Sequence, residues 1–214
     1  MTTTVEVIVN DVSELLQDIN KERWADSVLT RWLGESEQLI ATHKPEAVAV
    51  KASVALVAGV DQSLPTDALM LLRARRNTAS GIVVQLVDED TQNRALPSWP
   101  SATQVTDVTS YMYDAQVDPL NFMVSPPNDA AGSLEVVYAK IPTPVNATTD
   151  LISVSDSFVP LIKDYVMYRA LQMETEGQSL NRAMSHLQTF MTGLGLNTQA
   201  LNKFDPLREV AENE

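Results

Sequence analysis

The N-terminal segment has the apolar spacing of an amphipathic helix, with Thr3 and Glu6 placed as a capping box at its start. A second helix is predicted from Asp26, acting as N-cap, to Pro45, because the residue before a proline is disfavoured in the helical conformation. In the first helix, apolar residues recur at intervals of three and four and so share one face; they are Val5, Ile8, Val9, Val12, Leu15, Leu16 and Ile19.

In the C-terminal part of the chain, apolar residues again recur at the helical spacing of three and four. A long helix is predicted from Ser155 or Asp156, and Gly177 breaks or bends it. The apolar pattern resumes at Leu180, and Gly193 or Gly195 closes the helix. Residues 196–214 are polar and irregular and end in acids, which is typical of a tail that is disordered or ordered only by a partner.

Between these two helical parts, apolar residues alternate with other residues, which indicates strands. A short helix is predicted from Asp88 to Leu96, a turn after Gly59, and a loop from Pro126 through Ser133. The predicted strands are residues 47–56, Leu69–Thr78, Ile82–Val87, Val105–Tyr113, Phe122–Val124 and Leu134–Ile141.

These periods predict an α+β protein whose termini close around an insert. Residues 1–46 and 150–195 would form a bundle of about four helices. Residues 47–149 would form an inserted, antiparallel β-rich lobe, and residues 196–214 an extended or partner-ordered tail.

Composition narrows the possible functions. The chain has no cysteine, so disulfides, thiolate nucleophiles and cysteine-ligated metals are excluded, as fits assembly in a reducing cytosol. Its net charge is −13, which disfavours gripping nucleic acid but lets DNA pass without adhering. No membrane segment or secretory signal is expected.

Catalytic and metal-binding patterns are not found. His43 and His186 lie on amphipathic helices without a carboxylate at an obvious orienting position. The acidic run Asp88-Glu89-Asp90 lacks the glycine of a calcium loop. No nucleophile elbow or phosphate-binding loop is present, so we expect no catalytic residue, metal or cofactor.

The basic cluster Arg73, Arg75 and Arg76 has two interpretations. It contacts DNA or an acidic neighbour, or it is the exposed charged face of an alternating strand. In an acidic chain, pairing with protein is favoured over duplex binding, so these arginines are candidates for subunit or tail contact. Trp99, between two prolines, is a second candidate for that contact.

Large aromatic residues on the predicted helices are candidates for the core. Trp24 would pin the first two helices together, and Trp32 lies on the apolar face of the second. Tyr165 and Phe190 lie on the apolar faces of the C-terminal helices.

Four blocks of residues follow one another along the chain. The first block is Arg23-Trp24 ahead of Asp26, Arg31-Trp32-Leu33 and Lys44-Pro45-Glu46-Ala47. The second is Ser53–Gly59 leading to Leu64-Pro65. The third is Asp118-Pro119 through Phe122 to Pro126-Pro127, then Glu135-Val136-Val137-Tyr138, and the fourth is Asp164–Ala170 with Phe190 and Leu194-Gly195. In this order, over about residues 4 to 195, the blocks resemble the head-to-tail adaptor (connector) proteins of short-tailed bacteriophages. Gly34 and the tail beyond Gly195 depart from the family pattern.

The resemblance implies a structural virion protein that acts in DNA ejection. About twelve copies would form a ring between the portal and the tail or nozzle and would extend the DNA channel. In the tail, Leu201, Phe204 and Leu207 are candidate anchors against the portal or a neighbour.

Two other functions stay open. A carbohydrate-binding tail component would need an exposed aromatic groove, for which Tyr111, Tyr113 and Phe122 are near enough. A hydrolase would use carboxylates from separate loops, such as Asp88, Asp90 and Asp118.

Overall fold

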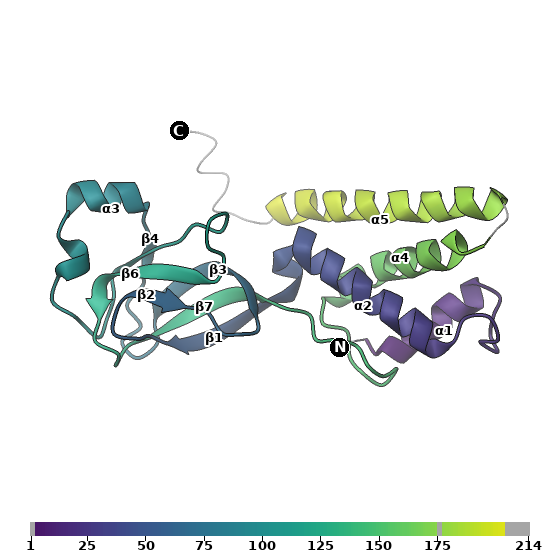
Figure 1. Cartoon of the computed structure of the whole chain (residues 1–214), viewed down its shortest axis with the longest axis horizontal. Coiled ribbons are helices and arrows are strands. Elements are labelled where there is room, and N and C mark those ends of the chain that lie inside the picture. Colours follow the sequence, from purple (N-terminus) through teal and green to yellow (C-terminus); the bar gives the residue numbers. More distant parts are fainter. Residues whose placement is uncertain (1–2, 175–176, 204–214) are drawn as a thin grey trace. The chain divides into compact units, whose positions relative to one another are not determined.

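The computed structural model describes residues 3–174 and 177–203, with side chains for 3–174 and 179–195. The chain forms two compact units (Figure 1). The β unit is Val48–Ile141, and the helical unit consists of the chain before and after it. The predicted α+β class is confirmed. The sequence assigned residues 142–149 to the β-rich lobe, whereas the structure assigns them to the helical unit.

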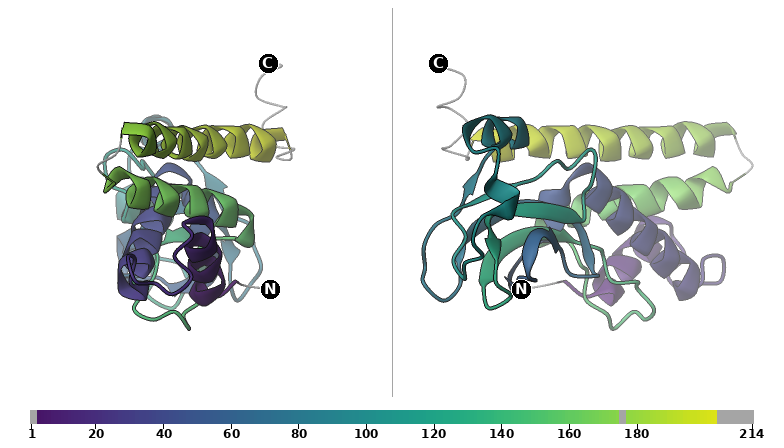
Figure 2. Two further views of the ribbon diagram at one scale, coloured as in Figure 1. Left: turned by 90° about the vertical axis from the view of Figure 1, so that its right-hand side faces the viewer. Right: turned by 60° about the vertical axis from the view of Figure 1, so that its left-hand side comes forward.

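In the helical unit, α4 (Val159–Gln172) packs against each of the other three described α-helices. These are α1 (Val5–Leu15), α2 (Asp26–His43) and α5 (Gly177–Lys203). Short 3₁₀ turns precede α4 (Asp156–Phe158) and follow α2 (Pro45–Val48). Helix α5 runs alongside α4 in every view (Figures 1 and 2).

The start of the chain differs from the prediction in two details. The N-cap of α1 is Thr4, without a side-chain capping bond, so the capping box does not form. The helix ends at Leu15, and Ile19 is exposed. Beyond it, the Asp18 carboxylate accepts hydrogen bonds from the amides of residues 22–24 and so orders the connector to α2.

Helix α5 does not end at Gly193 or Gly195 but continues to Lys203. Gly193 serves packing instead, because the side chain of Leu161 on α4 occupies the space where a Cβ atom would lie. The predicted stop is therefore wrong. A glycine inside a helix can mark a close approach of two helices as well as a helix end.

The β unit contains two sheets, with strand orders β1-β7-β3 and β2-β6-β5-β4. All described pairs are antiparallel except β4 with β5. The strands are β1 (Ala49–Ala55), β2 (Gly59–Ser63), β3 (Ala68–Asn77), β4 (Gln85–Leu86), β5 (Ser110–Met112), β6 (Asn121–Asn128) and β7 (Ser133–Lys140). Helix α3 (Glu89–Ala95) and a 3₁₀ turn (Trp99–Ser101) lie between β4 and β5 in the chain.

Inward-facing residues of both sheets form one hydrophobic core. The first sheet contributes Val136 and Leu71, and the second contributes Tyr111 and Phe122. Because side chains alternate along a strand, the residues between these point to the outer face of each sheet.

Several parts of the β unit differ from the sequence prediction. The predicted strands Ile82–Val87 and Val105–Tyr113 shorten to Gln85–Leu86 and Ser110–Met112. The segment after Gly59, predicted as a turn, forms strand β2. Pro126 and Pro127, predicted in a loop, lie inside β6. The buried Asn128 ends this strand: its amide group donates to two backbone carbonyls, and its Oδ1 accepts from two backbone amides.

Candidate interaction surfaces

The outer face of the β1-β7-β3 sheet carries a group of cations that we call the basic face, made of Lys51, Arg73, Arg75 and Arg76 around Glu135. Lys51 Nζ lies 2.9 Å from Glu135 Oε2, and Arg76 Nη2 lies 3.2 Å from the same oxygen. Arg75 Nη1 is 3.4 Å from Glu135 Oε1. The three arginines singled out from the sequence are exposed, and one acid faces four cations.

Register explains this arrangement. Lys51 pairs with Val137 on β7, and Arg73 pairs with the same residue from the other side. Arg76 pairs with Glu135. Hydrogen bonds from Lys51, more than the opposing partial desolvation, hold the pKa of Glu135 below its usual value. The carboxylate is thus charged and bound by its neighbours.

An acidic pocket of about 450 Å³ lies at the second sheet. Asp61 on β2, Met123 on β6 and Met112 on β5 are paired in register and line it. Tyr111 and Phe122, their neighbours along the strands, belong to the core. Phe122 and the partly buried Tyr113 also line the pocket, which is therefore not confined to the outer face of the sheet. The acidic residues of the pocket are Asp61, Asp88, Glu89, Asp90, Asp114 and Asp118.

Three carboxylates proposed for a hydrolase, Asp88, Asp90 and Asp118, do come together in this pocket. The side chain of Asp88 caps α3 by accepting from the Thr91 amide at 3.1 Å. The pKa of Asp118 is lowered, chiefly by the hydrogen bond from the Asn121 side chain. A general acid needs a raised pKa, the opposite of the shift at Asp118. The hydrogen bonds of Asp88 and Asp118 serve the local fold.

The aromatic groove needed for carbohydrate binding is not formed by the residues named for it. Tyr111 and Phe122 are buried in the core of the β unit. The hydroxyl of Tyr113 donates to the Pro119 carbonyl and accepts from the Leu71 amide. Tyr113 and Phe122 also line the acidic pocket, but neither ring is exposed, so the exposed aromatic groove of the carbohydrate-binding alternative is not seen at these positions.

Trp99 has an intramolecular role. Its indole is buried in the β unit, and Nε1 donates to Asn93 Oδ1 on α3 at 2.8 Å. The 3₁₀ turn that starts at Trp99 also packs against β6. The expectation that this indole forms an exposed contact is not met, because its surface is used to hold α3 on the sheet.

The four aromatic residues assigned to the core lie in one cluster of the helical unit. Trp24 and Trp32 have ring centroids 5.5 Å apart, and Tyr165 lies 5.2 Å from Phe190. Arg169 joins the two pairs: its guanidinium lies 5.9 Å from the Trp32 ring and donates to the Tyr165 hydroxyl. All four aromatic residues are buried.

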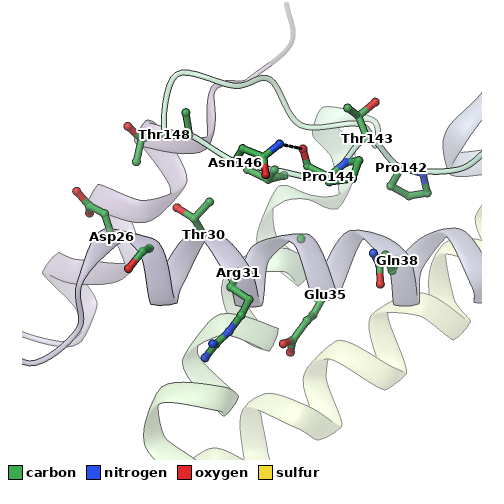
Figure 3. A pocket seen from close by; sticks show the side chains of 14 residues that line it. Asp26, Thr30, Arg31, Glu35, Gln38, Pro142, Thr143, Pro144, Asn146 and Thr148 are labelled. Atoms are coloured by element: carbon green, nitrogen blue, oxygen red, sulfur yellow. Dashed lines mark hydrogen bonds between the residues drawn. The ribbon is translucent and has the colours of Figure 1, made fainter.

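A groove of about 450 Å³ separates α2 from the loop of residues 142–148 (Figure 3). Asp26 and Thr30 reach toward the loop, whereas Arg31 and Glu35 project to the other side of α2. Glu35 pairs with Arg169 of α4 at 3.0 Å. A Cβ at Gly34 would meet Val145 at ordinary contact distance, so the space between α2 and the loop admits a Cβ atom at this position.

The same loop region is tied to α2 by Glu37, whose side chain is fully buried. Its Oε1 accepts hydrogen bonds from the amides of Ser153 and Val154. Burial raises the pKa of Glu37, and these two hydrogen bonds oppose the shift. Nothing in the residue pattern marks Glu37 as special, because a glutamate on a helix is ordinarily solvated.

His186 does have an orienting carboxylate, contrary to the sequence-based expectation. Its Nδ1 lies 2.8 Å from Asp164 Oδ1, joining α5 to α4. The two residues are far apart in sequence, so helical spacing within one segment could not reveal the pair. His43 is exposed at the end of α2.

An exposed apolar stripe follows the outer side of α5. Leu180, Met184 and Met191 are each about half exposed and lie four and seven residues apart, which places them on one helical face. Exposed apolar side chains gathered in this way mark a surface that binds protein.

Of the candidate tail anchors, Phe204 and Leu207 lie outside the described residues. Leu201 is on the described backbone of α5, but its side chain is not described. In the part of the chain that the structure describes, no group of three histidine or acidic residues could hold a metal ion. No described helix is both long enough and apolar enough to span a bilayer.

These features define an α+β protein that offers charged and apolar surfaces to other proteins. The family model described as SU10 adaptor protein matches residues 3–209, nearly the whole chain, and the chain belongs to that family. The predicted resemblance to an adaptor family of bacteriophages is thereby confirmed. No curated protein matches the chain.

Sequence reasoning found the arginines but missed the residues that complete both charged surfaces. Lys51 and Glu135 belong to strands that were predicted, and their alternation with Val50 and Val136 was the available signal. Asp61 was missed because its strand was predicted as a turn.

Proposed function

We propose that this chain is a structural virion protein, a head-to-tail adaptor that makes and breaks no covalent bond. Its copies form a ring between the portal and the tail or nozzle and extend the DNA channel. It is assembled in the host cytoplasm and resides in the neck of the virion. The observation that carries the proposal is membership of the adaptor family over residues 3–209.

The surfaces of the chain support this role. An adaptor in a ring must contact its own copies and a different protein on each side, and therefore needs several distinct surfaces. The chain offers the basic face and the acidic pocket on the β unit and the apolar stripe on α5. The net charge of −13 suits a channel wall, because it repels the phosphates of passing DNA.

In this proposal the arginines of the basic face contact a subunit or the tail. Leu201, Phe204 and Leu207 anchor the C-terminal tail on the portal or a neighbour, as apolar side chains enter grooves on a partner.

The test is to locate the protein in the particle. Antibody-labelled particles of the phage that encodes the chain should carry the label at the portal vertex, and mass spectrometry should detect the protein in purified virions. Particles assembled without it should keep a filled or fillable head and lack an attached tail. Absence of the protein from tailed virions contradicts the proposal.

The tail anchors are tested separately with a chain that stops after Gly195. We expect the full chain to co-sediment with its portal and the shortened chain to stay free, while circular dichroism shows a loss of helix no larger than the end of α5 that the truncation removes. Equal co-sedimentation of both chains would show that the anchors lie elsewhere.

A further inference from the structure

Opposite charges are segregated onto opposite faces of the β unit. Four of the unit's six basic residues form the basic face, on the outer side of the β1-β7-β3 sheet. Six of its ten acidic residues line the acidic pocket, at the other sheet. The shared core lies between the two sheets, so Lys51 and Arg73 on the first sheet and Asp61 on the second lie on outer faces that point away from each other.

Within one chain these surfaces cannot neutralise each other. The single negative charge of Glu135 neutralises only part of the positive charge of the basic face. The side chains of Lys51, Arg75 and Arg76 remain about half exposed. Arg73 is exposed and makes no ion pair within the part of the chain that the structure describes. At the pocket, Asp61 and Asp90 are likewise exposed.

We infer that the basic face of one copy docks onto the acidic pocket of the next copy. This inference rests on the proposed function, since it names the contact through which copies of the adaptor join. A contact between two different surfaces is heterologous, and repeated heterologous contacts close into a ring when the rotation allows it. Complementary potentials of this kind set the register of a contact and suppress wrong partners.

A second copy fits the basic face better than DNA does. Duplex binding draws on a positive field around the whole domain, whereas the β unit has ten acidic and six basic residues and the chain carries −13.

The experiment uses zero-length carbodiimide cross-linking, which joins a lysine amine to a carboxylate in direct contact. The full chain, half of it isotopically heavy, is treated at low ionic strength and digested. We expect heavy-to-light peptides that join Lys51 to Glu89 or Asp90. The bond from Lys51 to Glu135 within one chain, whose atoms are 2.9 Å apart, serves as the internal control.

Charge reversal then tests the pairing. Arg73→Glu should lower the heavy-to-light yield about tenfold, and Asp90→Lys should do the same, because each places like charges across the contact. Mixing the two variants should restore the yield to within about threefold of wild type, since each supplies the charge that the other needs. Arg182→Glu, an exposed site on α5 with the same change in net charge, should leave the yield unchanged.

Several outcomes overturn the inference. These are a chain that gives no heavy-to-light products, cross-links that map elsewhere, and reversal without rescue on mixing. Duplex binding that Arg73→Glu abolishes, without self-association, would assign the face to DNA instead. Labelling of the portal vertex in virions is independent of all these results, so the proposed function can survive the loss of this contact.

Discussion

Gly193 of α5 faces Leu161 of α4 so closely that a Cβ atom at position 193 would overlap the leucine side chain. Gly195, two residues further along the same helix, has no described atom within 4 Å of the place where its Cβ would lie. The two glycines therefore differ in what they do, although both interrupt the same apolar pattern.

Alanine at these two positions should shift stability in opposite directions. Gly195→Ala should stabilise by about 0.5–1 kcal/mol, because glycine is the poorer residue in a helix. Gly193→Ala should destabilise by about 1–2 kcal/mol, because Leu161 must move in a packed interface. Urea unfolding of the two variants measures both values. Equal stabilisation by both would show that Leu161 yields freely.

Glu37 should make the stability of the helical unit pH-dependent. Burial raises its folded-state pKa, so its contribution is fully present below the unfolded pKa and is lost as the pH rises through the folded pKa. Glu37→Gln stays neutral and keeps an acceptor for the Ser153 amide. We expect it to match wild type at acidic pH and to exceed it in unfolding free energy at neutral pH.

The matched variant Glu37→Leu separates burial from hydrogen bonding. It leaves the amides of Ser153 and Val154 without their acceptor and should be about 1–3 kcal/mol less stable than Glu37→Gln. Thermal unfolding followed across the acidic to neutral range checks both expectations. If the stability of wild type and that of Glu37→Gln change in parallel with pH, the pKa of Glu37 is not raised in the folded protein, and the prediction is wrong.

Asn128 should be intolerant of charge. Its Nδ2 donates to the carbonyls of Val105 and Thr106, at 3.0 and 2.9 Å. Asn128→Asp puts a carboxylate oxygen against those carbonyls in a fully buried site, and should cost about 3 kcal/mol or more. The control is Asn146→Asp, at an exposed residue with one bond to the Pro144 carbonyl, which should change stability by less than about 0.5 kcal/mol.

Glu135 should show the opposite pH dependence to Glu37. Hydrogen bonds from Lys51 depress its folded-state pKa, so its contribution is present above the unfolded pKa and is lost as the pH falls through the folded pKa. Glu135→Gln should be less stable than wild type at neutral pH, and the two should converge in acid. Because the pair is at the surface, added salt should also narrow the difference. Unfolding at two salt concentrations provides that check.

The sequence by itself determined the local elements and their order. Apolar spacing in Val5–Leu15, and alternation in Ala49–Ala55 and Ser133–Lys140, follow from the periods of helix and strand, so they can be read without knowing any partner. The order of helices, strands and helices was enough to predict an α+β class with an inserted lobe. Alternation alone would put the adjacent Arg75 and Arg76 of β3 on opposite faces, and the register shift between Ala74 and Arg76 brings both to Glu135.

Only the tertiary structure decided which distant residues meet. The pairing of His186 with Asp164, the burial of Glu37 beneath Ser153 and the gathering of Asp61 with Asp90 each join separate segments. Local periodicity carries no information on such contacts, which depend on how whole elements pack. The role of Gly193 also depends on packing. A glycine can end a helix or can allow a second helix to approach closely, and the contact with Leu161 shows that Gly193 does the second.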